Sequence, residues 1–135
     1  MAASFKFDLV SPERLLVSEQ VEYVIIPGAE GEMTVLAQHA PVMTTIKPGI
    51  VTVKTAEGKV DRYVVFGGFA DILPETCTLL AESATHVDEI DRASLARRIQ
   101  EAKEDVADAH DEQSRTRAEE FLGQLTTLEG AIIPA

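Results

Sequence analysis

The sequence contains one cysteine, Cys77, and no tryptophan among its 135 residues. A single cysteine cannot form a disulfide or a thiolate metal cluster within one chain. The cysteine content is therefore consistent with a reducing compartment. Basic residues are also few, 12 against 23 acidic ones, which gives a net charge of -11. This charge opposes contact with nucleic-acid phosphates and with anionic lipid headgroups. We therefore expect no nucleic-acid partner and no direct adsorption to a membrane.

Long apolar runs are missing as well. No segment approaches the roughly 20 apolar residues that cross a bilayer. The first eight residues, MAASFKFD, have the features of neither a signal peptide nor an arginine-rich transit peptide. With 45% hydrophobic and 26% charged residues, the chain has the composition of a folded protein of ordinary domain size. We expect a packed protein that stays in the compartment where it is made.

The first 85 or so residues carry the pattern of short strands. Phe5, Phe7 and Leu9 alternate with charged residues, as in a strand with one buried face. Residues 56–58 are expected to form a hairpin turn with a glycine at its end. Further β-branched segments, each bounded by turn residues, are 20–26, 32–36, 42–46, 50–55, 60–66, 69–73 and 77–84. Roughly eight to ten short strands predict two packed antiparallel sheets or a barrel, and we favour the sandwich.

A helical period begins near Asp88. Apolar residues spaced by three or four positions form one stripe at Leu95, Ile99, Ala102, Val106 and Ala109. This stripe predicts a helix from Asp88 or Asp91 to His110, because either aspartate can cap its first turn. The module boundary is expected near residue 86.

A second helical stripe follows the polar break at 111–114. Its members, again three or four residues apart, are Ala118, Phe121, Leu125, Leu128 and Ile132, and Pro134 ends it. Matching stripes with a short link predict an antiparallel two-helix hairpin. Gly123 and Gly130 each cost about 1 kcal/mol in a helix interior, so this helix is expected to fray or stop early.

Groups that could carry chemistry are scattered. His86 and His110 lack the spacing of a helical metal site and are interpreted as solvent-exposed histidines. Cys77 falls inside an alternating strand and is interpreted as a small buried side chain. The Gly-Ala-Glu-Gly sequence at 28–31 lacks the lysine of a phosphate-binding loop and predicts a turn. The sequence therefore predicts no catalytic residue, no metal ion and no cofactor.

Several short motifs occur together in one order. They are Val10-Ser11-Pro12, Pro27-Gly28-Ala29-Glu30-Gly31-Glu32-Met33, Gln38-His39-Ala40-Pro41-Val42, Ile46-Lys47-Pro48-Gly49, Phe66-Gly67-Gly68-Phe69 and Thr78-Leu79-Leu80-Ala81. With these motifs, residues 5–110 resemble the epsilon subunit of bacterial F-type ATP synthases. The resemblance implies a ten-stranded β-sandwich over residues 1–86 and a helical hairpin over residues 87–135. It also implies a non-catalytic central-stalk subunit of the proton-translocating enzyme.

The same resemblance implies partners and a location. The sandwich is expected to dock on the gamma subunit and on the polar loops of the c-ring, and the hairpin could reach the alpha/beta head. Glu32 and His39 correspond to contacts with the c-ring. The protein would lie on the cytoplasmic face of a bacterial inner membrane, held by protein contacts alone. A plastid-encoded member is the alternative.

Two activities of the family are expected to be weak here. Members that bind ATP resemble Ile/Leu-Asp-x-x-Arg-Ala, with a glutamate six residues before the aspartate. Of the polar positions in this pattern only Asp91 is retained, because Ser94 replaces the arginine and Thr85 replaces the glutamate. We therefore expect a degenerate nucleotide site with weak or no ATP binding.

Braking of ATP hydrolysis in the family depends on a basic face of the second helix. From Asp111 onward this chain has two basic residues, Arg115 and Arg117, against five acidic ones. An acidic helix is repelled by an acidic surface, so we expect little inhibition. The residues leave two rival functions open: a free β-sandwich adaptor or small-ligand module with a dimerising hairpin, and an enzyme of unknown type.

Overall fold

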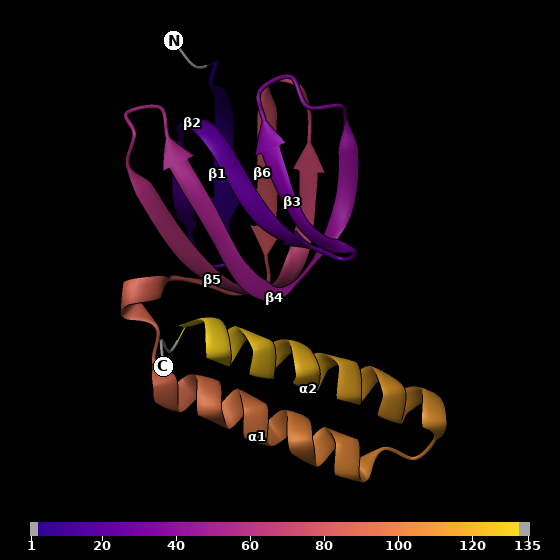
Figure 1. Cartoon of the computed structure of the whole chain (residues 1–135). Coiled ribbons are helices and arrows are strands. Elements are labelled where there is room, and N and C mark those ends of the chain that lie inside the picture. The colour runs from indigo at the N-terminus through magenta and orange to yellow at the C-terminus, as the bar shows by residue number, and fades with distance from the viewer. Residues whose placement is uncertain (1–2, 133–135) are drawn as a thin grey trace. The chain divides into compact units, whose positions relative to one another are not determined.

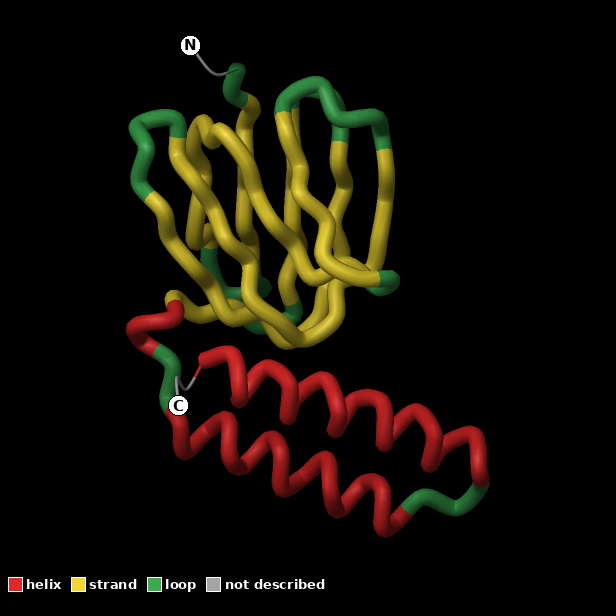
Figure 2. Tube along the Cα trace, in the orientation of Figure 1, coloured by secondary structure: helices red, strands yellow, loops and turns green. Residues whose placement is uncertain are grey.

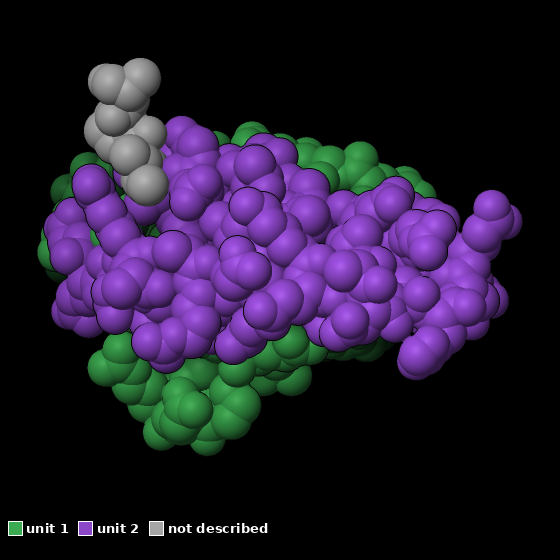
Figure 3. Space-filling view, turned by 90° about the horizontal axis from the view of Figure 1, so that it is seen from below, with its two compact units in different colours: residues 1–87 green, residues 88–135 purple. Residues whose placement is uncertain are grey.

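The computed structural model describes residues 3–132. The chain forms two compact units, residues 1–87 and residues 88–135. Figure 1 labels the elements of both units, and Figure 3 colours the two units separately. The first unit holds strands β1 to β7, and a short 3-10 helix, η1, begins at its last residue. Their bounds are Phe5–Val10, Leu15–Gly28, Gly31–Leu36, Val42–Thr55, Val60–Ile72, Thr76–Ala81, Ala84–His86 and Val87–Glu89.

The β-rich unit is one sheet that closes on itself. The strands follow the order β1-β6-β5-β4-β2-β3, and β1 also pairs with β2, while β7 pairs with β5. All pairs are antiparallel except β1 with β6, which is parallel. Figure 2 shows the strands curving around a common interior. The predicted β-sandwich followed by a helical hairpin is confirmed as a fold class.

The predicted alternation of the first strand is also confirmed. Phe5, Phe7 and Leu9 are at most 2% exposed, and they belong to the single hydrophobic cluster at the centre of the sheet. Their neighbours Lys6 and Asp8 are only half-buried. A period-two pattern at the start of the chain therefore marks the side of β1 that packs into the core.

The strands are fewer and longer than the sequence predicts. β4 runs through Pro48-Gly49, where the pattern predicts a strand end. β5 runs through Gly67-Gly68, where the sequence predicts a bulge or a close backbone approach within the sheet, and Gly68 does make such an approach. The β4–β5 ladder keeps one register from Val42 opposite Ile72 to Lys54 opposite Val60. Prolines and glycines can bend a strand without ending it when the pairs on both sides hold the ladder. The predicted breaks are therefore bends within strands.

The second unit is the predicted helical hairpin. α1 spans Arg92–Asp108 and α2 spans Glu112–Ile132, and the two helices pack side by side (Figure 1). Asp91 caps α1, and the Asp111 carboxylate accepts a hydrogen bond from the N–H of Ser114 at 2.7 Å. The buried members of the two predicted stripes are Leu95, Ile99, Ala102, Leu125 and Leu128.

The expected early end of the second helix is wrong. α2 continues through Gly123 and Gly130 to Ile132. Leu125 and Leu128 lie between the two glycines and are at most 2% exposed. Burial of two leucines is worth about 3 to 6 kcal/mol, which exceeds the roughly 2 kcal/mol that two glycines cost. Pro134 lies outside the described residues.

A close approach between β5 and β6 requires glycine at position 68. The φ angle of Gly68 is +143°, in a region that L side chains rarely adopt. A Cβ atom there would overlap the carbonyl oxygen of Leu80 and would lie 2.9 Å from the Cα of Ala81. Both atoms are backbone, so neither can move without disturbing β6.

We predict that Gly68→Ala destabilises the β-rich unit strongly. The matched control is Gly58→Ala, because Gly58 also has a positive φ, +96°, but has no atom within 4 Å of the added Cβ. The control should lose about 1 kcal/mol from strain alone, and Gly68→Ala about 3 kcal/mol or more from strain plus overlap. Urea unfolding measures both losses, and equal losses would contradict the close approach.

Candidate functional site

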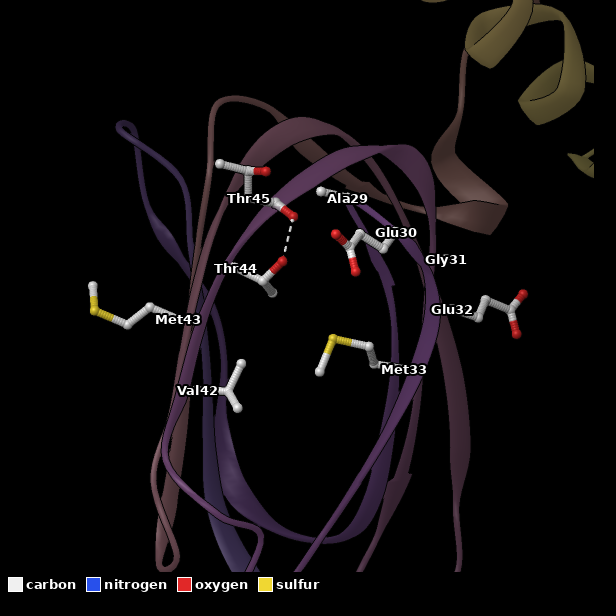
Figure 4. A pocket seen from close by; sticks show the side chains of 9 residues that line it. All are labelled: Ala29, Glu30, Gly31, Glu32, Met33, Val42, Met43, Thr44 and Thr45. Atoms are coloured by element: carbon white, nitrogen blue, oxygen red, sulfur yellow. Dashed lines mark hydrogen bonds between the residues drawn. The ribbon is translucent and has the colours of Figure 1, made fainter.

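A hollow of about 570 Å³ lies where the β2–β3 turn meets β4. Two chain segments line it, residues 29–33 and residues 42–45. The alternation of β3 and β4 decides which of their side chains face the hollow, and Glu30 lies in the turn before β3. Figure 4 shows Glu30, Met33 and Val42 on the side of the hollow, whereas Glu32 and Met43 point away from it.

The residues around this hollow are better suited to contact with a partner than to catalysis. The residues around it include Glu30, Glu32, two threonines and apolar residues, without histidine, cysteine or basic groups. The Thr44 hydroxyl donates to the carbonyl oxygen of Thr45 at 3.1 Å (Figure 4). A nucleophile needs a base within hydrogen-bond reach, and the lining residues offer no such pair. The hollow can receive a polar or cationic group from a partner.

The two predicted partner contacts lie at opposite ends of β3. Glu32 is the second residue of β3 and is exposed, and its side chain points outward. Residues 32 to 36 of the strand span about 13 Å at the usual rise. His39 lies beyond the end of the strand, in a turn where its N–H donates to the carbonyl oxygen of Leu36 at 3.3 Å. The N–H of Gln38 donates to the carbonyl oxygen of Pro74 at 2.8 Å, which holds the His39 loop against the β5–β6 turn. The structure therefore does not bring Glu32 and His39 together.

The three residues at which a degenerate nucleotide site is predicted all belong to local structure. Asp91 accepts hydrogen bonds from the N–H of Ala93 at 2.9 Å and from the hydroxyl of Ser94 at 3.0 Å. These bonds, that of Ser94 first, lower the pKa of the Asp91 carboxyl. Thr85 lies in β7, opposite Val64 of β5, and is half-buried. Asp91 and Ser94 thus serve the first turn of α1.

Cys77 is the buried side chain that the sequence predicts. It is completely buried in β6, and burial, with a smaller contribution from Asp71, raises the pKa of its thiol to about 12. A thiol with so high a pKa is almost entirely protonated at neutral pH, so it does not act as a nucleophile.

The interpretation of His86 as a solvent-exposed histidine is wrong. Its side chain is 28% exposed, its Nε2 lies 3.2 Å from Asp61 Oδ1, and its ring meets Tyr63 edge-on. The cause is the pairing of β7 with β5, which sets His86 opposite Tyr63. Pairing between distant segments leaves no local signal, although the alternation of 60–66 does mark Tyr63 as a strand residue. His110 is exposed, as predicted.

No group of three or more His, Cys, Asp or Glu side chains between residues 3 and 132 is arranged to hold a metal ion. Neither of the two described helices is both long enough and apolar enough to span a membrane.

Comparison with known proteins gives consistent matches. Residues 4–87 match the family model described as ATP synthase, Delta/Epsilon chain, beta-sandwich domain. Over the full length of both chains, the sequence is 78% identical to the ATP synthase epsilon chain of Mesorhizobium japonicum. The identity is 67% to that of Chelativorans sp. and 62% to that of Brucella abortus, again over 100% of each chain.

Two solved structures have the same fold. One is a chain in the Euglena gracilis mitochondrial ATP synthase, in a structure of OSCP, F1 and the c-ring, with a TM-score of 0.76 and 32% identity. The match covers 97% of this chain and 82% of that one. The other is in the central stalk and c-ring of Tetrahymena thermophila mitochondrial ATP synthase, with a TM-score of 0.72 over 96% of each chain. At 14% identity the second match shows the fold alone.

The cap of α1 gives a prediction with a pH dependence. Because the folded-state pKa of Asp91 lies below its ordinary value of 3.8, its stabilisation is complete above that pH and is lost as pH falls through the folded value. Asp91→Ala should lower the thermal midpoint at neutral pH, whereas Asp91→Asn, which can still cap, should lower it little.

Circular dichroism of the helices provides the measurement, at neutral pH and at a pH below the folded-state pKa of Asp91, which itself lies under 3.8. The original chain should have a slightly higher thermal midpoint than Asp91→Asn at neutral pH, and this difference should disappear in acid. An advantage that stays constant with pH would rule out the charged cap.

Proposed function

Because the chain belongs to the ATP synthase delta/epsilon family and is similar to epsilon chains over its whole length, we propose that it is a non-catalytic central-stalk subunit. In this role it couples rotation of the c-ring, through the gamma subunit, to ATP synthesis in the catalytic head. The observation that carries the proposal is the 78% identity to an epsilon chain over 135 residues. The protein catalyses nothing itself.

The closed sheet supports a role in transmitting force. Each strand of the ring β1-β6-β5-β4-β2 is paired on both sides. Sliding one strand past another would break backbone hydrogen bonds on both of its edges, and the buried core opposes the same motion. Such a unit can be turned as one rigid body by a partner that grips its surface.

Glu32 and His39 are proposed as contacts with the polar loops of the c-ring. They lie at opposite ends of β3, so they would be two separate contacts along the length of the strand. The hollow beside Glu30 offers a carboxylate near the first of them. We further propose that the protein is a peripheral subunit on the cytoplasmic face of a bacterial inner membrane, held there by its protein partners.

Binding of ATP is proposed to be weak or absent. A phosphate group needs a cation, and Ser94 stands where ATP-binding relatives carry arginine. Arg92 is two residues earlier and would point about 200° away around the helix. The carboxylate of Asp91 already accepts two hydrogen bonds from its own helix.

We predict no measurable ATP binding by the isolated subunit in isothermal titration, up to about millimolar nucleotide, which corresponds to a binding free energy weaker than about -4 kcal/mol. The comparison variant Thr85→Glu/Ser94→Arg restores the two missing side chains and should bind ATP more tightly than the original chain. A micromolar dissociation constant for the original chain would refute weak binding.

Inhibition of ATP hydrolysis is also proposed to be weak. Two arginines in the segment from residue 111 onward are outweighed by five acidic residues, Asp111, Glu112, Glu119, Glu120 and Glu129. Apart from Glu129, which is half-buried, these acidic side chains are exposed. A basic face that could attach to acidic loops of the catalytic head is therefore lacking.

The complex depleted of this subunit and then reconstituted tests both coupling and inhibition. The full chain and a chain lacking residues 111–135 should both restore ATP-driven proton pumping, and ATPase rates should differ less than about twofold, or roughly 0.4 kcal/mol. Glu119→Lys/Glu120→Lys reverses two exposed charges without shortening the helix, and it should increase inhibition. A several-fold rise in ATPase rate after the deletion would contradict weak inhibition, and hydrolysis without pumping would contradict coupling.

A further inference from the structure

The turn after β3 contains a backbone conformation that is unusual for its residue type. Among residues 3–132, Gln38 is the only residue other than glycine with a positive φ angle, 65°. This angle lies in the left-handed region, which a residue with a Cβ atom adopts only where the surrounding structure holds it there. The side chain of Gln38 is exposed and has no hydrogen-bond partner within the same range. The conformation of Gln38 is therefore held through its backbone.

Two backbone hydrogen bonds hold the turn in place. The N–H of Gln38 donates to the carbonyl oxygen of Pro74, in the turn between β5 and β6, at 2.8 Å. The next N–H, that of His39, donates to the carbonyl oxygen of Leu36 at 3.3 Å. Successive N–H groups thus bond to different segments of the chain, and the left-handed conformation of Gln38 sets the angle between them.

The turn between β5 and β6 is a firm support for Gln38. The N–H of Leu73 donates to the carbonyl oxygen of Thr76 at 2.8 Å and closes this turn. The N–H of Lys6 in β1 donates to the carbonyl oxygen of Glu75 at 3.0 Å, so the turn is also attached to the strand that closes the sheet. The bond from Gln38 to Pro74 therefore connects the turn after β3 to the closed sheet.

The same turn decides which nitrogen of the His39 ring carries the proton. Nδ1 of His39 lies 2.7 Å from the carbonyl oxygen of Ala40. A carbonyl oxygen only accepts hydrogen bonds, so Nδ1 has to be the protonated nitrogen, and Nε2 of the neutral ring keeps a lone pair. Nε2 has no hydrogen-bond partner within residues 3–132. The neutral ring of His39 therefore offers an acceptor to another molecule.

We propose that Gln38 is a positioning residue, whose left-handed backbone and bond to Pro74 hold the His39 ring so that Nε2 accepts a hydrogen bond from a partner subunit. The partner group that meets His39 is then a donor, such as an amide, hydroxyl, guanidinium or ammonium group. The proposal rests on the proposed function, in which His39 contacts the c-ring, and it adds the chemistry of the partner's side. A turn that is already formed also avoids the cost of ordering on binding.

Nitrogen NMR of the His39 ring in the full chain tests the state of the ring, at a pH of about 8.5 where histidine is neutral. The form with the proton on Nδ1 should predominate in the original chain and in the matched control Gln38→Asn, because asparagine also tolerates a positive φ and keeps the N–H. Gln38→Pro should lose this preference, since proline has no N–H and a φ of about -65°. An original chain protonated mainly on Nε2, or an unchanged ring in Gln38→Pro, would overturn the proposal.

Binding of the chain to the complex depleted of this subunit tests the contact itself. Gln38→Pro should weaken binding about fivefold, the size expected for one hydrogen bond, and Gln38→Asn should bind like the original chain. In a chain that already carries His39→Ala, Gln38→Pro should have little further effect, because Gln38 acts through His39. His39→Glu, which only accepts hydrogen bonds, should bind more tightly than His39→Lys, which only donates them.

The outcomes separate this proposal from the proposed function. If the original chain does not join the complex, the central-stalk function fails, while the NMR result still decides the state of the ring. If Gln38→Pro weakens binding equally with and without His39, Gln38 does not act through His39 and the proposal is overturned. Tighter binding by His39→Lys than by His39→Glu would overturn it as well. If Gln38→Pro lowers the thermal midpoint, Gln38→Val takes its place, because valine keeps the N–H but disfavours a positive φ.

Discussion

The pairing of β1 along both of its edges is the constraint on which the β-rich unit depends. β1 joins β2 in the antiparallel sense and β6 in the parallel sense, and these two ladders close the sheet. The same strand buries Phe5, Phe7 and Leu9 in the core. Because the same strand closes the sheet and fills the core, its backbone hydrogen bonds and its buried side chains stabilise the unit together. The parallel pairing also sets Val10 opposite Leu80.

The local pattern of the sequence is sufficient to predict those parts of the structure that depend on neighbours along the chain. The alternation at Phe5, Phe7 and Leu9 and the helical stripe through Leu95 and Ile99 were visible in the sequence because burial imposes a fixed period. Pairing between segments that are distant in the sequence leaves no such periodic pattern. The passage of β4 and β5 through their predicted breaks depends on the ladder between them, and the contact of His86 with Asp61 depends on the pairing of β7 with β5.

The candidate site shows the same division. The motif comparison predicts that Asp91 is the one retained polar position of a degenerate nucleotide site, and the structure adds what its carboxylate does, which is to cap α1. Glu32 and His39 were found by resemblance, but their separation along β3 required the strand itself. The two units therefore differ in their proposed roles. The β-rich unit carries the proposed contacts, whereas the hairpin has Ser94 where an arginine would bind a phosphate group.

Rotation of the subunit within the working enzyme tests the central claim most directly. Glu57 lies in the exposed turn between β4 and β5, so Glu57→Cys offers an attachment point for a visible probe. The buried Cys77, whose thiol pKa is raised to about 12, would not compete for the label. With the catalytic head fixed to a surface, the account predicts that the probe turns during ATP hydrolysis. A probe that stays still while the same complex hydrolyses ATP would contradict it.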